Sequence, residues 1–434
     1  MDNQRFAAPD GGPGGYSRKI LLPAALASVC TLCPEVHRSA LDMPSVRNKK
    51  KPSEVLLYAA PSKSADLRWF SDFQAADPFP AFSMGGRRVG LLPLLEVGRA
   101  QKESAFDEVL NLTEIINDLR RTNPQAGIAD AITFAALREG VQEFRVPSDF
   151  PVGLFLRLKE LGLNLISVGS AQDERSAPPL FPNRWIKTKK EIGGIKAGNR
   201  AASAGFKVVE KILGEAKADK AGKLSWNKQT LTAEVLHSHV QIAVTAAGGQ
   251  LDAGMICAPG DQAVDCHSEG SGPIFAGQLI VVDIFPRDRA SGNYGDMTRT
   301  YLKGRATPVQ RRMVQSVRKA QGLALKAIRA GVTGADVHKQ VAGYLASLGY
   351  KTEKVGEQYV GFFHGTGHGL GYDLHEEPYL SARFPKPLQV GQCVTVEPGL
   401  YYPGIGGCRI EDCVVVTKTG CQMLSRHPYR WEIA

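Results

Sequence analysis

The sequence lacks any apolar run of the ~18 residues that a membrane-spanning helix needs, which argues against a membrane protein. It also lacks zinc-finger spacing and any aromatic-basic RNA-binding motif. Its formal net charge is +10, but the basic residues cluster only in two short runs, at 49–51 and 187–190, and are otherwise scattered. We therefore expect no nucleic-acid partner and no membrane association.

The cysteines do not form the pattern of a disulfide framework, although the chain contains eight of them. Cys30 and Cys33 form a Cys-x-x-Cys pair, but no second pair lies nearby, so we interpret it as accidental. The other six lie within or beside apolar, strand-like runs, which indicates reduced, buried thiols and a cytoplasmic protein: Cys257, Cys266, Cys393, Cys408, Cys413 and Cys421.

The first 42 residues allow three interpretations. Arg18 and Lys19 precede an apolar segment, and residues 25–27 have the small-x-small form of a signal-peptidase site. Pro23 interrupts that segment, however, which disfavours a secreted protein. A leader, a disordered extension and a translation start at Met43 all stay open.

The middle of the chain alternates between two kinds of pattern. Apolar residues at helical spacing predict helices over 106–121, 128–139 and 152–161, and short β patterns predict strands over 54–61, 87–93, 143–146 and 164–168. A linker follows at about 169–183, where Ser, Asp, Glu and Pro residues break the pattern. We therefore predict an extension or leader over 1–52 and a small α/β domain over 53–175.

The rest of the chain, 176–434, reads as one α+β domain. Thr188 and Glu191 have the form of a capping box, which predicts a helix from there to about 213. Further helices are predicted over 230–246, 308–329 and 334–348, and the remaining segments are mostly short β patterns with Gly-rich turns.

Two aspartates in this second domain lie on neighbouring strand patterns. An apolar run ends in Asp283, and after a turn-rich stretch the chain returns through Asp296. Two strands joined by such a loop would bring both side chains together. A buried pair of like carboxylates is costly without a cation, and a divalent metal removes that cost.

Further metal-ligand types follow along the chain. His364, His368 and His375 lie among glycines, which let the backbone approach closely, and imidazole is a preferred ligand of first-row metals. Glu397 and Glu411 lie at the ends of strand patterns. Each feature alone is more often structural than functional. Together, four carboxylates and one neutral histidine balance two divalent cations, as a dinuclear site requires.

These residues lie in sequence blocks that resemble those of the pita-bread metallopeptidases, which have the creatinase/aminopeptidase fold. Within that family they look most like the branch of Xaa-Pro dipeptidases (prolidases) and Xaa-Pro aminopeptidases. The resemblance covers about 184 to the C-terminus and is looser before it. It implies an α+β fold, with a C-terminal pita-bread domain preceded by a smaller α/β creatinase-type domain. The blocks are 282–283, 295–300, 364–371, 375–378, 396–401 and 407–412.

The resemblance also implies a set of metal ligands. Asp283 would chelate one metal, Asp296 and Glu411 would bridge both, and His368 and Glu397 would complete the second metal. We expect two divalent ions, Mn²⁺ first, with Co²⁺ or Zn²⁺ as alternatives.

The loop between the aspartates is two residues longer than the family's common spacing. Asp288 lies inside it and could be mistaken for the first ligand. We prefer Asp283, because it ends the apolar strand and hairpin pairing can bring it to Asp296.

The same resemblance implies roles for other residues around the metals. His267 would contact the substrate, His375 would stabilise the oxyanion, and His364 would line the pocket for the proline side. Arg409 could pair with a carboxylate, either a ligand's or the substrate's. Thr298 and Thr395, two further residues, look like groups that orient the ligands.

The implied reaction is hydrolysis of Xaa-Pro bonds in proline-containing peptides. The metals would lower the pKa of a bridging water to ~7, and Glu397 could pass its proton to the leaving nitrogen. We expect a homodimer. A His-Glu-x-Pro stretch at 375–378 mildly favours bacterial-type prolidases, but dipeptidase and aminopeptidase both stay open.

Four other interpretations are weaker, and one of them is a soluble α/β protein whose acidic strand ends are coincidental. A methionine aminopeptidase shares the five ligands but commonly has no preceding α/β domain. A creatinase-like hydrolase lacks the full ligand set, which is complete here. A catalytically silent pita-bread binding protein usually has damaged ligands.

Overall fold

The computed structural model describes residues 54–168 and 180–434. The interpretations of the N-terminal segment, including the Cys30–Cys33 pair and the start at Met43, lie outside these residues, as does most of the predicted linker. Within the described residues no helix has the length and apolarity that crossing a membrane requires. All the cysteines in the described residues are free, and Cys257, Cys393, Cys408 and Cys413 are buried.

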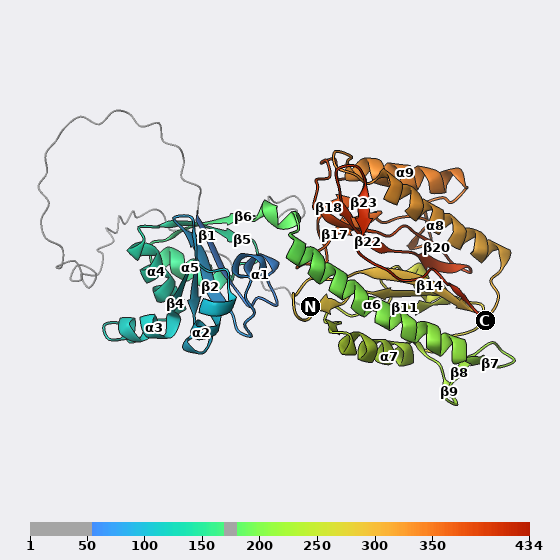
Figure 1. The fold of residues 1–434 in the computed structure, drawn as a ribbon, viewed down its shortest axis with the longest axis horizontal. Coiled ribbons are helices and arrows are strands. Elements are labelled where there is room, and N and C mark those ends of the chain that lie inside the picture. The colour runs from blue at the N-terminus through green and yellow to red at the C-terminus, as the bar shows by residue number, and fades with distance from the viewer. Residues whose placement is uncertain (1–53, 169–179) are drawn as a thin grey trace, which may run out of the picture. The chain divides into compact units, whose positions relative to one another are not determined.

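Residues 54–168 form one six-stranded mixed sheet with the strand order β4-β3-β2-β1-β5-β6 (Figure 1). The strands are β1 (Glu54–Ala59), β2 (Phe79–Met84), β3 (Arg87–Leu92), β4 (Glu108–Asn111), β5 (Glu143–Pro147) and β6 (Asn164–Val168). The helices are α1 (Ala65–Ser71), α2 (Leu94–Glu103), α3 (Leu112–Arg120), α4 (Ile128–Arg138) and α5 (Val152–Glu160). Strands and helices alternate through most of this region, as an α/β fold requires.

One predicted helix in this region is partly wrong. The helix expected over 106–121 begins only at Leu112, and the residues before it form β4, which pairs in parallel with β3. Asn111 sets the boundary, because its side chain accepts hydrogen bonds from the backbone N–H groups of Thr113 and Glu114 and so caps the helix. The predicted helices at 128–139 and 152–161 are confirmed as α4 and α5.

Residues 180–434 contain four long helices, all close to their predicted bounds. They are α6 (Lys189–Glu215), α7 (Ala233–Ala246), α8 (Pro308–Ala327) and α9 (Gly334–Ser347), and a 3₁₀ turn, η2 (Pro182–Trp185), precedes them. The predicted capping box at the start of α6 is present, since Thr188 and Glu191 bond each other's backbone N–H groups.

Two larger sheets lie among these helices. One has the order β11-β12-β14-β24, with β11 (Ile256–Pro259), β12 (Leu279–Ile284), β14 (Met297–Lys303) and β24 (Glu432–Ile433). The other has the order β18-β17-β19-β22-β23, with β17 (Gly367–Gly369), β18 (Glu376–Leu380), β19 (Cys393–Val396), β22 (Asp412–Val416) and β23 (Cys421–Met423). Strands β20 (Gly399–Tyr402) and β21 (Gly406–Arg409) form a hairpin between β19 and β22 in the chain.

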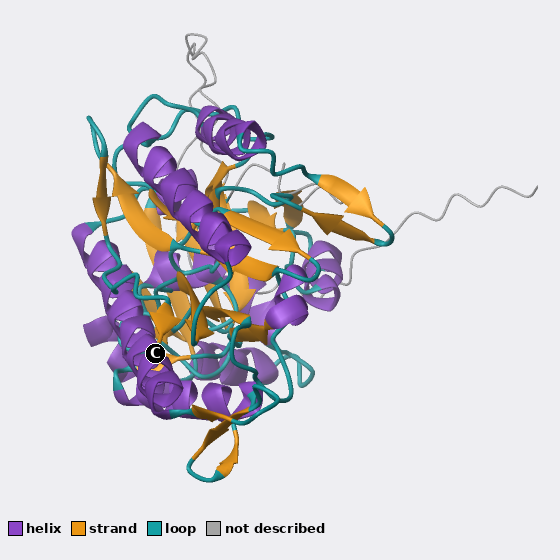
Figure 2. Cartoon of the chain, turned by 90° about the vertical axis from the view of Figure 1, so that its right-hand side faces the viewer, coloured by secondary structure: helices purple, strands orange, loops and turns teal. Residues whose placement is uncertain are grey.

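The remaining short strands form three small ribbons. They are β10 (Gly249–Gln250) with β13 (Arg287–Asp288), β15 (Glu353–Val355) with β16 (Gln358–Val360), and β7 (Lys217–Ala218), β8 (Leu224–Trp226) and β9 (Gln229–Thr230). The β7–β9 ribbon projects from the packed layers, as Figure 1 and Figure 2 both show. A second 3₁₀ turn, η3 (Gly260–Val264), follows β11.

Each pair of long helices packs on a different part of the sheets. Phe206 of α6 and Val240 of α7 share a buried cluster with Ile284 of β12. Val317 of α8 shares a second cluster with Val394 of β19 and with α9. The strands therefore lie between the two helix pairs, as Figure 1 shows, and both of their faces are covered.

Candidate metal centre

Strands β12 and β14 position the two aspartates. Asp283 lies directly opposite Thr298 in the antiparallel pair, and Asp296 stands just before β14. Residues two apart on a strand share a face, so Asp283 and Asp296 are diagonal neighbours on one face. Asp288 lies elsewhere, in β13, where its carboxylate accepts hydrogen bonds from the N–H and hydroxyl of Ser291 at 2.9 and 2.6 Å.

The second sheet supplies the other three predicted ligands. His368 is the central residue of β17, Glu397 follows β19, and Glu411 precedes β22. Because Val396 pairs with Asp412, the two glutamates occupy adjoining positions at the ends of neighbouring strands. The backbones of β17 and β19 approach closely at this end, and only glycine fits at position 367. A Cβ added at Gly367 would lie 2.0 Å from the carbonyl oxygen of Thr395.

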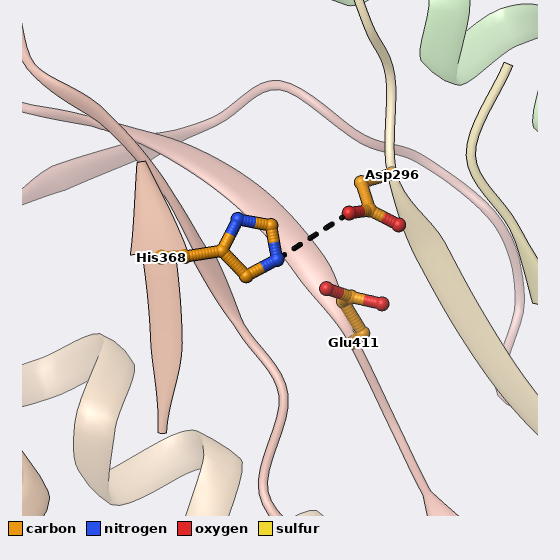
Figure 3. Close-up of side chains that lie close together, drawn as sticks. All are labelled: Asp296, His368 and Glu411. Atoms are coloured by element: carbon orange, nitrogen blue, oxygen red, sulfur yellow. Dashed lines mark ion pairs between the residues drawn. The ribbon is translucent and has the colours of Figure 1, made fainter. Parts of the chain in front are cut away.

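Three of these residues form a compact cluster. One ligand atom from each of Asp296, His368 and Glu411 lies within 4.8 Å of the others, and all three side chains are buried. Figure 3 shows the imidazole of His368 facing Asp296, with the carboxylate of Glu411 beside them. His368 Nε2 lies 3.6 Å from an oxygen of Asp296 and 3.4 Å from an oxygen of Glu397.

The hydrogen bonds of His368 fix which ring nitrogen faces the cluster. Its Nδ1 lies 3.1 Å from the carbonyl oxygen of Gly369, which can only accept, so Nδ1 carries the proton. Burial and the neighbouring His375 lower the pKa of His368 to about 3, so the ring is neutral. Nε2 therefore presents a free lone pair to the carboxylates, as a metal ligand must.

The carboxylates repel one another in the absence of a cation. Burial, followed by Asp283 and Glu397, raises the pKa of Asp296 well above its usual value. Burial, followed by Asp296 and Glu397, does the same to Glu411, and burial raises the pKa of Glu397 to about 7. These groups become fully ionised together only if positive charge is placed among them.

One oxygen at the site has no partner at all within the described residues. Asp283 Oδ1 is buried and makes no hydrogen bond to any of them. A buried carboxylate oxygen without a partner is costly, and a cation would remove that cost. Carboxylate oxygens and imidazole nitrogen are also the donors that Mn²⁺ and similar divalent ions take. The residues present therefore fit a divalent metal site.

Two threonines hydrogen-bond the candidate ligands. The hydroxyl of Thr298 donates to Glu411 Oε2 at 2.7 Å. The hydroxyl of Thr395 donates to Glu397 Oε1 at 3.3 Å and accepts from the backbone N–H of His368 at 3.1 Å. Both threonines thus lie where the sequence analysis expected orienting residues, although that role stays a prediction.

Arg409 pairs with a candidate ligand. Its Nη2 donates to Asp283 Oδ2 at 2.7 Å, and its Nε donates to the hydroxyl of Thr298 at 3.2 Å. Its Nη1 donates to the hydroxyl of Tyr401 at 2.9 Å and to the carbonyl oxygen of Cys266 at 3.1 Å. The guanidinium is buried and committed to protein groups, which favours the first of its two predicted partners, a ligand's carboxylate.

His364 is tied to Tyr401. Its Nδ1 donates to the carbonyl oxygen of Gly365 at 2.7 Å, so its Nε2, 2.9 Å from the Tyr401 oxygen, accepts a hydrogen bond. Burial and then the charge of Arg409 lower the pKa of His364 to about 3. Tyr401 lies in one of the sequence blocks that resemble the family, but no sequence pattern assigns it a role, and only the fold brings it between His364 and Arg409.

The other two predicted histidines, His267 and His375, are exposed. The ring of His375 lies 4.3 Å from that of His368, nearly perpendicular to it. Burial and then the charge of His267 lower the pKa of His375. His267 follows Cys266, whose carbonyl oxygen accepts a hydrogen bond from Arg409. The structure therefore brings all of the predicted site residues into one region, and their catalytic roles stay predictions.

Comparisons with known sequences agree with this arrangement. The profile of metallopeptidase family M24 matches residues 194–418. A probable dipeptidase PepE of Mycobacterium tuberculosis is 32% identical over 254 residues, which cover 57% of this chain and 60% of that protein. An Xaa-Pro dipeptidase of Pyrococcus furiosus is 31% identical over 248 residues, covering 56% and 64%. The match thus spans less than two thirds of these relatives' own length.

Comparisons with solved structures extend over more of the chain. Dipeptidase PepE of Mycobacterium ulcerans superposes with a TM-score of 0.65 at 26% identity, covering 88% of this chain and 93% of that one. An X-Pro aminopeptidase of Thermotoga maritima gives 0.70 at 22% identity, covering 88% and 97%. The predicted fold is confirmed, an α+β chain whose pita-bread domain follows a smaller α/β domain. The boundary at 175–176 stays a prediction.

Proposed function

The chain belongs to metallopeptidase family M24, and from this premise we propose that it hydrolyses Xaa-Pro peptide bonds with two divalent metal ions. The observation that carries the proposal is the buried cluster of Asp296, His368 and Glu411, with a partnerless oxygen of Asp283 nearby. Several relatives are named Xaa-Pro dipeptidases, which supports the choice of bond.

The five predicted ligands would hold the metals between the two sheets. Asp283, Asp296, Glu397 and Glu411 would supply oxygen donors, and His368 would supply a nitrogen donor. When bound, the metals would polarise the scissile carbonyl and make a water acidic enough to be a nucleophile near neutral pH. We propose Mn²⁺ as the ion, with Co²⁺ and Zn²⁺ as alternatives for the same donors.

Residues of the chain would do the remaining work. Glu397, held by the Thr395 hydroxyl, would take a proton from the attacking water and deliver it to the leaving nitrogen. His375, exposed beside His368, would donate to the oxygen on which negative charge develops. His267 would contact the substrate from the same side.

Proline recognition would depend on shape, because an Xaa-Pro bond is a tertiary amide without an N–H to recognise. His364, which burial keeps neutral and whose Nε2 accepts a hydrogen bond from the Tyr401 hydroxyl, would form part of the wall for the pyrrolidine ring. We further propose that the protein works in the cytoplasm as a homodimer.

The test is an assay on protein stripped of metal with a chelator and reloaded with Mn²⁺, Co²⁺ or Zn²⁺, with metal content measured in parallel. Gly-Pro and Ala-Pro would report a dipeptidase, and an Xaa-Pro-Xaa tripeptide would report an aminopeptidase. Gly-Ala and Ala-Ala serve as matched peptides without proline. We expect hydrolysis of at least one proline peptide by the reloaded protein only. A fully loaded protein that cleaves none of the three would refute the proposal.

A further inference from the structure

A buried polar network lies behind the candidate metal centre. Arg299 follows Thr298 on β14, and Asp412 follows Glu411 on β22. Successive strand residues point to opposite faces, so this pair lies on the far side of the strands from the ligands. Arg299 Nη2 donates to Asp412 Oδ1 at 2.9 Å, and the side chains are 3% and 1% exposed.

Arg299 is bonded to the backbone at two points beside the ligands. Its Nη1 donates to the carbonyl oxygen of Thr298 at 2.9 Å and to that of Glu411 at 2.7 Å. Thr298 hydrogen-bonds the candidate ligand Glu411 through its hydroxyl, and Glu411 is itself the second of these residues. The guanidinium therefore ties β14 to the start of β22 at the point where the site needs them to meet.

Gln321 of α8 forms the second part of the network. Its Nε2 lies 3.0 Å from Asp412 Oδ2, 3.2 Å from the carbonyl oxygen of Val396 and 3.4 Å from that of Ile410. Val396 immediately precedes Glu397, and Ile410 immediately precedes Glu411. The backbone leading into both glutamates thus converges on one buried amide.

Residues 425–429, which follow β23, close the network. The hydroxyls of Ser425 and Tyr429 donate to the two oxygens of Asp412. Arg299 also donates to the carbonyl oxygens of His427 at 3.0 Å and of Pro428 at 3.3 Å, and it stacks on the Tyr429 ring at 4.5 Å.

The ring of His427 anchors this segment to α6. Its Nδ1 lies 3.0 Å from the hydroxyl of Ser203, and its Nε2 lies 3.0 Å from a carboxylate oxygen of Glu210. The segment also lies beyond residue 418, where the match to the family profile ends.

Stability alone is a poor reason for such a network. Replacing a buried ion pair with apolar residues of similar size is often neutral or stabilising, because desolvation offsets the attraction between the charges. A polar network whose members are all bonded instead makes its surroundings rigid. Here the groups made rigid are the backbone segments that carry Glu397 and Glu411.

We propose that residues 425–429, acting through Arg299, Asp412 and Gln321, position Glu397 and Glu411 for metal binding. Arg299 and Tyr429 are positioning residues, since neither touches the ligand side chains. The inference rests on the proposed metal site, and it adds that the geometry of that site depends on a segment outside the family match.

The test compares Tyr429→Phe with Tyr402→Phe in the full chain. The first change removes the hydroxyl bonded to Asp412 but keeps the ring that stacks on Arg299. The second removes a hydroxyl that donates to the carbonyl oxygen of Lys351 at 2.8 Å, outside the network. Mn²⁺ affinity of the metal-depleted proteins is measured by titration calorimetry, and thermal unfolding of the metal-free proteins by circular dichroism.

We expect Tyr429→Phe to weaken Mn²⁺ binding about 10-fold, as the loss of groups that orient metal ligands commonly does. Its metal-free Tm should match that of Tyr402→Phe, which should bind Mn²⁺ like the wild type. Arg299→Lys keeps the charge but loses the planar fork, so it should weaken binding further. If that variant does not fold, Tyr429→Phe decides the question alone.

Two results would overturn the inference while leaving the proposed function intact. One is wild-type Mn²⁺ affinity in Tyr429→Phe, and the other is an equal loss in both tyrosine variants. A wild-type protein that binds no Mn²⁺, Co²⁺ or Zn²⁺ would instead refute the proposed metal site itself, and the inference with it.

Discussion

The two described regions of the chain bury very different side chains. In residues 54–168 the interior is apolar and centres on residues such as Leu56, Phe82 and Phe144, with few buried polar groups. In residues 180–434 the interior also holds many ionisable groups: Arg184, Lys187, Glu191, Asp283, Asp296, Arg299, His368, Glu376, Arg409, Glu411, Asp412 and His427.

The contrast separates a region built for stability from one built around a site. Burying an ionisable group costs several kcal/mol unless partners or a metal compensate for the lost water. A second buried cluster illustrates this near His375, where Glu376 pairs with Lys187 and Arg184. We therefore expect changes in the first region to affect stability alone, and changes at or beside the candidate ligands of the second to affect metal binding and activity.

The largest effect should come from Asp296→Ala. Loss of groups that merely orient metal ligands commonly costs ~10–100-fold in affinity or activity, so loss of a proposed metal ligand should exceed ~100-fold. Metal content by mass spectrometry and hydrolysis of Xaa-Pro peptides should fall together. Hydrogen exchange of 54–168 should stay as in the wild type. Retained activity would show that the ligand assignment is wrong.

Phe144→Ala should lower the stability of the protein and leave its metal affinity unchanged. This side chain is fully buried in the first region and packs against Phe82, with ring centroids 6.1 Å apart. Removing a buried phenylalanine costs about 3–5 kcal/mol of unfolding free energy, which urea titration can measure. Mn²⁺ affinity of the folded protein should not change. A drop in affinity would mean that the two regions are not separable as proposed.

Thr298→Val should have a smaller effect that is confined to the site. The change keeps the shape of the side chain but removes the hydroxyl that donates to Glu411 and accepts from Arg409. We expect Mn²⁺ affinity to fall about 10-fold in calorimetry. Thr300→Val is a poor control because that hydroxyl also bonds Arg409. Thr230→Val removes the same hydroxyl from an exposed residue of β9 and serves as a control outside the site.

Thr188→Ala should have the smallest effect. The hydroxyl caps the first turn of α6, and losing such a cap costs about 1 kcal/mol. Although Thr188 lies in the second region, it contacts none of the candidate ligands in the described residues. Thermal unfolding should shift slightly, while metal affinity and peptide hydrolysis stay unchanged. A loss of metal binding would show that the position of α6 controls the site.

Features with a local cause could be predicted from the sequence. The capping box at Thr188 and the hairpin carrying Asp283 and Asp296 each depend on residues close together in the chain. Four of the long helices were predicted within a few residues for the same reason. The residues of strand β4 are wrongly predicted as the start of a helix. They form a strand because they pair in parallel with β3, and their own apolar spacing does not reveal that partner.

The site was predictable as a set of ligands but not as a set of contacts. Residue types and the family resemblance pointed to the five candidate ligands. The bond from Arg409 to Asp283 joins strands that are distant in the chain, as do the contacts of Arg299 with Asp412 and His427. The periodicity and spacing of residues in the sequence do not reveal these side-chain contacts, because the contacts form only when the sheets and helices pack together.

The hairpin between the two aspartates suggests a place where the chain can be extended. Strand β12 is paired on both sides, with β11 and β14, so strand register and not loop length sets where Asp283 and Asp296 lie. Closing a longer loop is cheap, about 0.6 kcal/mol for each doubling of its length. Ala290 is exposed at the tip of this loop. A peptide tag or fluorophore grafted there would leave the spacing of the candidate ligands unaltered.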